Sequence, residues 1–257
     1  MELRDTKDAL SLEVAAWLVV MFEEAHSVEE MGGLSEDLGE KLRALAVTAL
    51  LVDANANVFY HHLIRSARVR IHFLEGCMVQ NALQHFRRAC SRNEALFDSL
   101  TARDFDRASR IAELSPREWL SNAEYEDDYM YTQTIQLLLQ GGSSSAENMP
   151  VLLAQFERAL DGTASARLDV CQAFAARSQG DFDEAFEELL TEHDHDLEAQ
   201  RTRSVMQEAV SVSNQRVWIE GLGLLRLADK LGLRTASEYR YCPALARSPM
   251  TKPFPGE

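Results

Sequence analysis

Apolar residues recur at three- and four-residue spacing along most of the chain, which is the pattern of amphipathic helices. A first helix is predicted from the spacing of Leu10, Val14, Trp17, Leu18 and Met21. Met31-Gly32-Gly33 predicts the end of that helix or of its neighbour, and a second helix is expected from Ser35 onward. Residues 57–90 are interrupted only by Gly76, so they predict one long helix or two abutting ones.

The middle of the chain predicts a short helical hairpin followed by a long helix. Residues 96–100 and 105–114 form the two arms of the hairpin. Ser115-Pro116-Arg117-Glu118 then has the order of a helix start, with a capping serine, a proline in the first turn and a glutamate three residues after the serine. We therefore expect a helix over 119–140.

The second half predicts five further helices, over 149–160, 164–177, 182–193, 196–212 and 214–231. Gly232 follows the last one, where a C-terminal cap belongs. Residues 141–145 read Gly-Gly-Ser-Ser-Ser, which predicts a surface loop near 141–146. No run of alternating apolar residues argues for a sheet. The sequence thus predicts an all-helical domain over 1–240 and an extended, proline-bearing tail over 241–257.

Two segments that start at residues 102 and 179 resemble each other. They read Ala-Arg-Asp-Phe-Asp-Arg-Ala and Gln-Gly-Asp-Phe-Asp-Glu-Ala, and each lies between two apolar helical runs. In each, the aspartate can cap the second helix while the aromatic and the alanine pack back on the first. The second copy is similar to the turn of a tetratricopeptide unit, but no regular period links the copies. We predict packed antiparallel helical hairpins, partly tetratricopeptide-like, in a single compact domain.

Composition and charge narrow the class of protein. Hydrophobic residues make up 46% of the chain, and the formal net charge is −15. The charge disfavours nucleic acid and anionic membranes as partners, and it favours a basic protein or serves solubility alone. The start of the chain lacks the features of a secretory signal, and its apolar run at 14–22 is too short to span a bilayer. A cytoplasmic protein with no membrane partner is expected.

The search for catalytic chemistry finds little. The four cysteines include no CxxC pair, and Cys77 and Cys171 are expected to be buried thiols. His61-His62 are adjacent, and His193 and His195 are two residues apart, so neither pair shares a helix face as a helix-borne zinc site requires. Phosphate-binding glycine loops and nucleophile elbows are missing from the sequence. We expect no catalytic residues, no metal site and no cofactor.

Negative charge is concentrated in two stretches. Nine acidic residues and no Lys or Arg lie between Ser178 and Gln200, and residues 124–131 interleave four carboxylates with three tyrosines. Either stretch could be a solvated helix face. As an interface, tyrosines would supply rigid contact area and carboxylates would steer a basic partner. The predicted partner-binding residues are Glu124, Tyr125, Glu126, Asp127, Asp128, Tyr129, Tyr131, Asp194 and Asp196.

Three segments resemble the immunity protein 49 family, which comprises helical immunity proteins of bacterial polymorphic-toxin systems. The first is Asn81-Ala82-Leu83-Gln84-His85-Phe86-Arg87-Arg88-Ala89. The second is Gly180-Asp181-Phe182-Asp183-Glu184-Ala185-Phe186 with His193 after it. The third runs from Trp218 to Ala228, with Gly232, Tyr239 and Pro243 after it. The resemblance spans residues 81–243, and the first 80 residues add little to it.

The resemblance implies a protein that binds a cognate toxin or effector and blocks it without catalytic residues of its own. The acidic balance would suit a basic, nuclease-like toxin domain that acts in the cytoplasm. Two alternatives stay open: a helical-hairpin adaptor or chaperone for a secreted effector, and an enzyme with a metal-dependent site around His193 and His195. Whether the chain forms a homodimer is also open.

Overall fold

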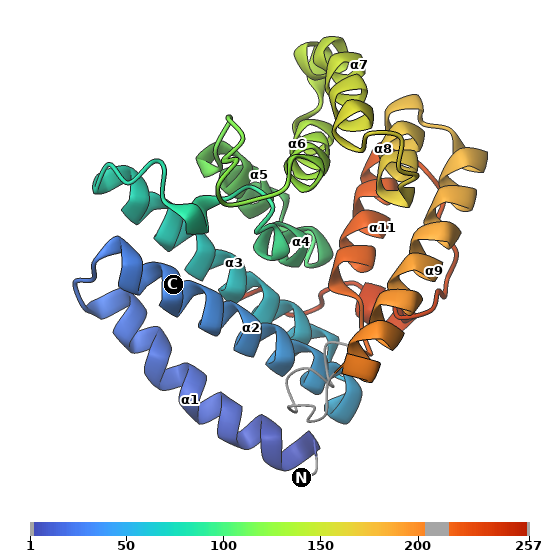
Figure 1. Ribbon diagram of the computed structural model, residues 1–257. Coiled ribbons are helices and arrows are strands. Elements are labelled where there is room, and N and C mark those ends of the chain that lie inside the picture. Colours follow the sequence, from blue (N-terminus) through green and yellow to red (C-terminus); the bar gives the residue numbers. More distant parts are fainter. Residues whose placement is uncertain (1–2, 204–215, 256–257) are drawn as a thin grey trace.

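The computed structural model describes residues 3–203 and 216–255 and confirms the all-α fold (Figure 1). The α-helices are α1 (Leu3–Glu23), α2 (Val28–Asp53), α3 (Ala56–Val79), α4 (Glu94–Thr101), α5 (Phe105–Leu114), α6 (Glu126–Gln140), α7 (Gly142–Ala159), α8 (Ala166–Ala176), α9 (Gln179–Arg203) and α11 (Ile219–Leu231). Two 3-10 turns, η1 (Phe86–Arg88) and η2 (Ala244–Arg247), complete the assignment. The described residues include no strand.

Consecutive helices pack as hairpins, as the sequence predicts. The pairs are α1 with α2, α2 with α3, α4 with α5, α6 with α7, and α8 with α9. Figure 1 shows α1, α2 and α3 side by side in the amino-terminal half, and α8, α9 and α11 together in the carboxyl-terminal half. The described helices form one compact packed domain.

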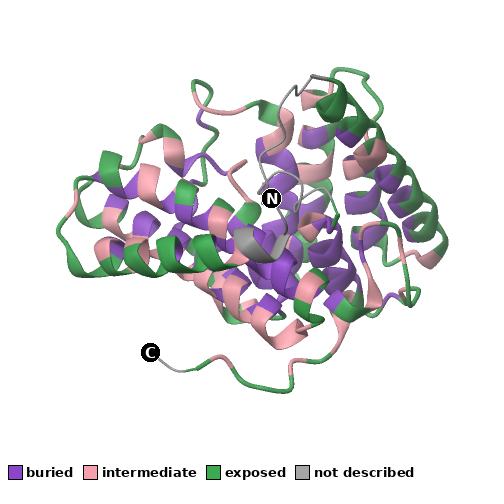
Figure 2. Cartoon of the chain, turned by 90° about the horizontal axis from the view of Figure 1, so that it is seen from below, coloured by how far each residue is buried: buried purple, intermediate pink, exposed green. Residues whose placement is uncertain are grey.

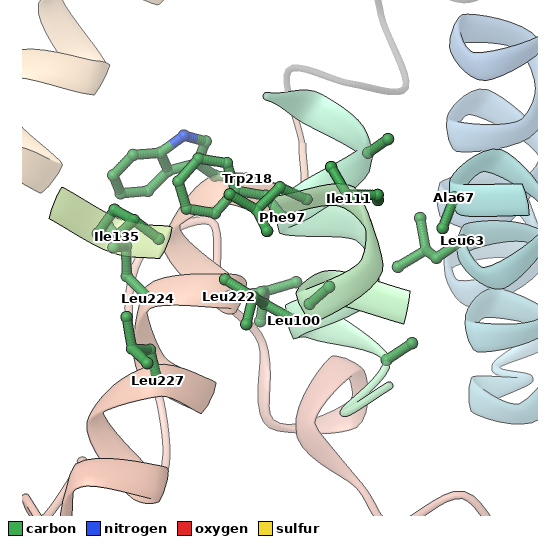
Figure 3. Packing of buried hydrophobic residues seen from close by; sticks show 14 of the residues in the cluster. Leu63, Ala67, Phe97, Leu100, Ile111, Ile135, Trp218, Leu222, Leu224 and Leu227 are labelled. Carbon is green, nitrogen blue, oxygen red and sulfur yellow. The ribbon is translucent and has the colours of Figure 1, made fainter. Parts of the chain in front are cut away.

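Helix α4 lies at the centre of the molecule. Although it has only 8 residues, it contacts α3, α5 and α11, so the last long helix returns to the middle of the chain. Figure 3 shows Phe97 and Leu100 of α4 lying between Leu222 of α11 and Leu63 of α3. Every residue of α4 after Glu94 is buried, and burial of this kind is the main source of stability in such a fold.

Helix α2 starts earlier than expected. Ser27 caps α2, and it forms a capping box with Glu30. The helix then runs through Gly32-Gly33, so the predicted break there is wrong. A Cβ at Gly32 would lie 2.6 Å from Cδ of Arg87, which shows that the glycine allows close packing rather than a turn.

Two predicted helices are shorter than the sequence suggested. The helix expected over 57–90 ends at Val79, because Asn81 takes a left-handed conformation with φ of 53°. The helix expected from 119 begins only at Glu126. Ser115, expected to cap this helix, instead follows the last residue of α5. Its hydroxyl donates to the carbonyl of Ile111 at 2.8 Å, so it caps no new helix.

The predicted surface loop near 141–146 is wrong in most of its length. Helix α7 already begins at Gly142, and the chain turns between α6 and α7 at Gly141 and Gly142, which have φ of 62° and 86°. Glycine permits this turn because it has no Cβ. Further along, residues 182–193 and the start of 196–212 belong to one continuous helix, α9, and residues 204–215 lie outside the described residues.

The two similar turns differ in detail. Asp104 caps α5 as predicted, with its carboxylate accepting from the backbone N–H of Arg107 at 3.1 Å. Asp181 does not cap, because α9 starts at Gln179 and places it in the first turn. Phe182 nevertheless packs back on the preceding helix, with its ring 5.4 Å from that of Phe174.

The segment after α11 runs back along the molecule. Gly232 caps α11 with φ of 87°, as predicted. The Tyr60 hydroxyl donates to the carbonyl of Ala246 at 2.9 Å, and Thr251 N–H donates to Asn57 Oδ1 at 2.8 Å, so the tail lies against α3. Figure 2 shows exposed residues along most of the final stretch. Cys77 and Cys171 are buried thiols, as expected.

Candidate partner-binding site

The two acidic stretches of the sequence meet at one hollow of about 230 Å³, which we call the acidic pocket. Five parts of the chain line it. The lining residues are Asp127, Asp128 and Tyr131 of α6, Phe156 of α7, Ser165 and Arg167 at the start of α8, Leu189, Glu192, His193 and Asp196 of α9, and Trp218 and Glu220 at the start of α11.

Local helix geometry brings the carboxylates to this hollow. Asp127 and Asp128 lie in the first turn of α6, where the amino end of the helix dipole favours negative charge. Glu192 and Asp196 are four residues apart on α9, so they project from the same face. Glu192 also accepts from the backbone N–H of Ala166 at 3.3 Å, which satisfies a free donor at the start of α8.

Arg167 is the single Lys or Arg among the described residues of the lining, and it pairs with two carboxylates of this pocket. Its Nη1 lies 3.2 Å from Asp128 Oδ1, and its Nη2 lies 3.2 Å from Glu220. The guanidinium also lies over the Tyr131 ring, 4.7 Å from the ring centroid. Burial lowers the pKa of Arg167, but the charges of Glu220 and Asp128 together raise it overall, so the guanidinium stays charged.

Tyr131 forms the floor of the pocket. Its side chain is 1% exposed, and its hydroxyl donates to Glu220 Oε1 at 2.8 Å. Burial raises the pKa of Tyr131 well above its usual range, so the phenol stays protonated and remains a donor. Burial also raises the pKa of Asp128, against the opposing effect of Arg167.

His193 stacks on the pocket wall. Its ring lies 4.4 Å from the Trp218 ring at an interplanar angle of 15°, and Tyr241 meets its edge at 5.2 Å. Its Nε2 is buried and has no hydrogen-bond partner among the described residues. Burial lowers the pKa of His193, against the opposing charges of Glu220, Asp196 and Asp194, so the ring is neutral near pH 7.

Four of the nine predicted partner-binding residues line the pocket: Asp127, Asp128, Tyr131 and Asp196. Asp194 lies on the same helix but holds the tail, since it accepts from the Tyr241 hydroxyl and pairs with Arg240 at 3.2 Å. That hydrogen bond from Tyr241 lowers the pKa of Asp194.

The other four predicted residues lie outside the lining. Tyr125 is 79% exposed, and Glu126 is exposed beside it. Tyr129 is buried, and its hydroxyl donates to the Arg117 carbonyl at 2.6 Å. Glu124 organises the 115–125 segment, because its carboxylate accepts from the backbone N–H groups of Ser91 and Leu120 at 2.6 and 3.3 Å. Tyr129, Tyr131 and Glu124 therefore have internal roles in this structure.

Sequence reasoning missed Arg167, Glu192, His193, Trp218 and Glu220 as members of this site. Glu192 belongs to the acidic stretch, and Trp218 and Glu220 belong to the third segment of the family resemblance. Nothing in the spacing joins residues near 128 to residues near 220, because only the packing of α6, α8, α9 and α11 brings them together.

Other site types receive no support from the described residues. No group of three or more His, Cys, Asp and Glu side chains in 3–203 and 216–255 is arranged to hold a metal ion. Within the same residues, every helix is either too short or too polar to cross a bilayer.

Comparison with known proteins places the chain in a family. No match was found among curated proteins or among solved structures. The model of one family, described as "Immunity protein 49", matches residues 36–246. The match starts well before Asn81, so the expectation that the first 80 residues contribute little is wrong for residues 36–80. Because it covers most of the chain, we conclude that this protein belongs to the immunity protein 49 family.

Proposed function

We propose that this chain binds and neutralises a cognate toxin in the cytoplasm, and that the acidic pocket with its rim forms the contact surface. Family membership supports the general role of an immunity protein. The observation that carries the assignment of the surface is the convergence of Asp127, Asp196 and Glu220, from three distant parts of the sequence, on one hollow.

Charge supports a basic toxin surface as the partner. The pocket lining holds five carboxylates (Asp127, Asp128, Glu192, Asp196 and Glu220) and one guanidinium, and the chain as a whole carries a net charge of −15. Complementary charge speeds the encounter of two proteins and orients them. A basic, nuclease-like toxin domain fits this surface.

Exposed side chains around the pocket supply the remaining contact area. Tyr125 is 79% exposed and precedes the first turn of α6, which carries Asp127 and Asp128. Tyrosine is enriched among residues that dominate binding energy, because it offers a large amphipathic surface at low entropic cost. We therefore keep Tyr125 as a direct contact, whereas buried Tyr129 and Tyr131 support the surface from below.

Co-expression with the neighbouring gene tests the proposal. The toxin domain encoded beside this chain is expected to stop growth alone and to be tolerated when this chain is present. The double variant Asp127→Asn and Asp196→Asn should lose protection and weaken binding of the purified toxin domain.

A matched control comes from the same helix. Glu187 and Glu188 are exposed on α9 and lie outside the pocket, so Glu187→Gln with Glu188→Gln removes the same charge and should keep full protection. A harmless neighbouring domain, or failure of the wild-type chain to restore growth, would refute the proposed function. Equal loss in both double variants would refute the assigned surface.

A further inference from the structure

The acidic pocket has more negative charge than its own basic residue can balance. Arg167 is shared between Asp128 and Glu220, each at 3.2 Å. Asp127 and Asp196 form no ion pair with any described residue, and Glu192 accepts only from a backbone N–H. Carboxylates gathered in a hollow repel one another, and a cation placed between them relieves that repulsion.

The aromatic side chains of the pocket lining also favour a cation. Three aromatic side chains, Tyr131, Phe156 and Trp218, contribute to the lining. Aromatic faces attract cations, and guanidinium groups stack on them especially well. The pocket contains an internal example, since the Arg167 guanidinium already lies 4.7 Å from the centroid of the Tyr131 ring.

His193 provides a second, independent indication. Its Nε2 is buried and unpartnered among the described residues, although the residue lines the pocket. A buried polar atom without a partner is costly, so Nε2 of His193 gains a hydrogen bond when a donor enters the hollow beside it. The neutral imidazole can accept a hydrogen bond there and adds no positive charge to repel a cation.

We propose that the acidic pocket receives one arginine side chain of the partner, with its guanidinium between Asp127, Glu192 and Asp196 and beside the stacked rings of His193 and Trp218. The cognate toxin would supply this arginine, and that part of the inference rests on the proposed function. Arginine fits better than lysine because its planar fork of donors can meet several carboxylates at once.

The pocket can be tested without the toxin. Arginine amide is titrated into the uniformly ¹⁵N-labelled full chain, and the indole N–H signal of Trp218, assigned with a Trp218→Phe variant, is followed by NMR. Citrulline amide, which has nearly the same shape and the same α-amino group but a neutral urea in place of the guanidinium, is the matched ligand. We expect a saturable shift with arginine amide, none with citrulline amide, and at least a tenfold weaker response in the Asp127→Asn and Asp196→Asn double variant.

The toxin domain then tests the source of the arginine. Its surface arginines are replaced one at a time by glutamine, and affinity is measured for wild type and for the double variant. Replacement of one arginine should weaken the affinity for the wild-type chain by about 30-fold or more. The same replacement should weaken the affinity for the double variant far less, because that arginine and the carboxylates act together. The Glu187→Gln and Glu188→Gln control should leave both the NMR titration and the affinity unchanged.

The possible failures are distinguishable. An equal shift with citrulline amide, or no shift with either ligand, overturns the arginine pocket. If the NMR shift depends on Asp127 and Asp196 but the double variant keeps its affinity for the toxin, the toxin does not supply the arginine. In that case, protection in cells would still support the proposed function. If the wild-type chain forms no complex with the toxin domain and does not protect cells, the proposed function itself is refuted.

Discussion

Two groups of charged residues in this molecule are built in opposite ways. The closed cluster, formed by Asp98, Arg43 and Ser66, joins α4, α2 and α3, and Asp98 is fully buried. Its Oδ2 accepts from Arg43 at 3.2 Å and from Ser66 at 2.6 Å. The acidic pocket instead presents five carboxylates to one guanidinium at the surface. Asp98 in the closed cluster is paired with Arg43, whereas Asp127, Glu192 and Asp196 in the pocket form no ion pair within the described residues.

The difference separates a carboxylate that is paired inside the fold from the carboxylates to which we assign a role in binding. A charge inside a protein is tolerated only when it is paired and hydrogen-bonded, so the closed cluster needs its partners for the fold to persist. A charge at the rim of a pocket keeps its hydration and costs the fold little. Substitutions in the two groups should therefore separate stability from binding.

The largest effect is expected for Asp98→Ala, which leaves the Arg43 guanidinium without its buried partner. We expect a loss of about 3 kcal/mol in the free energy of unfolding, measured by urea denaturation. Asp98→Asn keeps the shape and one hydrogen-bond acceptor, so it should lose less. Two variants with equal and small losses would show that the closed cluster is not needed for stability.

Gly221→Ala is expected to give the second-largest loss of stability, because the added methyl group would collide with an aromatic side chain of the pocket lining. A Cβ at this position of α11 would overlap the indole ring of Trp218, and the ring must move. Such overpacking costs roughly 1 to 3 kcal/mol. Gly33→Ala is the matched control, since Gly33 is also helical and a Cβ there would meet nothing within 4 Å. It should leave stability unchanged or raise it by up to about 1 kcal/mol.

The pH dependence of stability gives a smaller effect at the closed cluster. Burial raises the pKa of Asp98 from 3.8 to about 6, against the lowering effects of Arg43 and Ser66, while Glu94 adds to the rise. The folded chain thus binds more protons than the unfolded chain between these pH values. Lowering the pH from 7 to 5 should stabilise wild type relative to Asp98→Asn by about 1 kcal/mol, measured by urea denaturation at each pH. A constant difference between the two proteins would contradict a raised pKa.

The smallest effect on stability is expected for the pocket carboxylates. Asp127→Asn with Asp196→Asn should change the free energy of unfolding by no more than about 0.5 kcal/mol, because neither carboxylate pairs within the described residues. Thermal unfolding followed by circular dichroism measures this directly. A loss comparable to that of Asp98→Ala would mean that both groups serve the fold and would erase the contrast between them.

Local sequence signals predicted some helix ends correctly and others wrongly, for a physical reason. Asp104 and Gly232 act within one helix turn of themselves, so their capping roles could be read directly. Ser115 and Gly32 have signals of the same strength, yet the serine bonds backward to Ile111 and the glycine packs beneath Arg87. Tertiary contacts decided between two local options that the sequence leaves nearly equal.

The amino-acid sequence alone determined the all-helical class, the pairing of consecutive helices, the two acidic stretches and the family. These features depend on neighbouring residues or on the order of segments along the chain. Only the tertiary structure decided which acidic residues meet, that Tyr131 lies beneath the pocket rather than on its surface, and that Arg167, Trp218 and Glu220 join Asp127 and Asp196. Such a site depends on how α6, α8, α9 and α11 pack against one another, and contacts between residues so far apart along the chain leave no periodic trace in it.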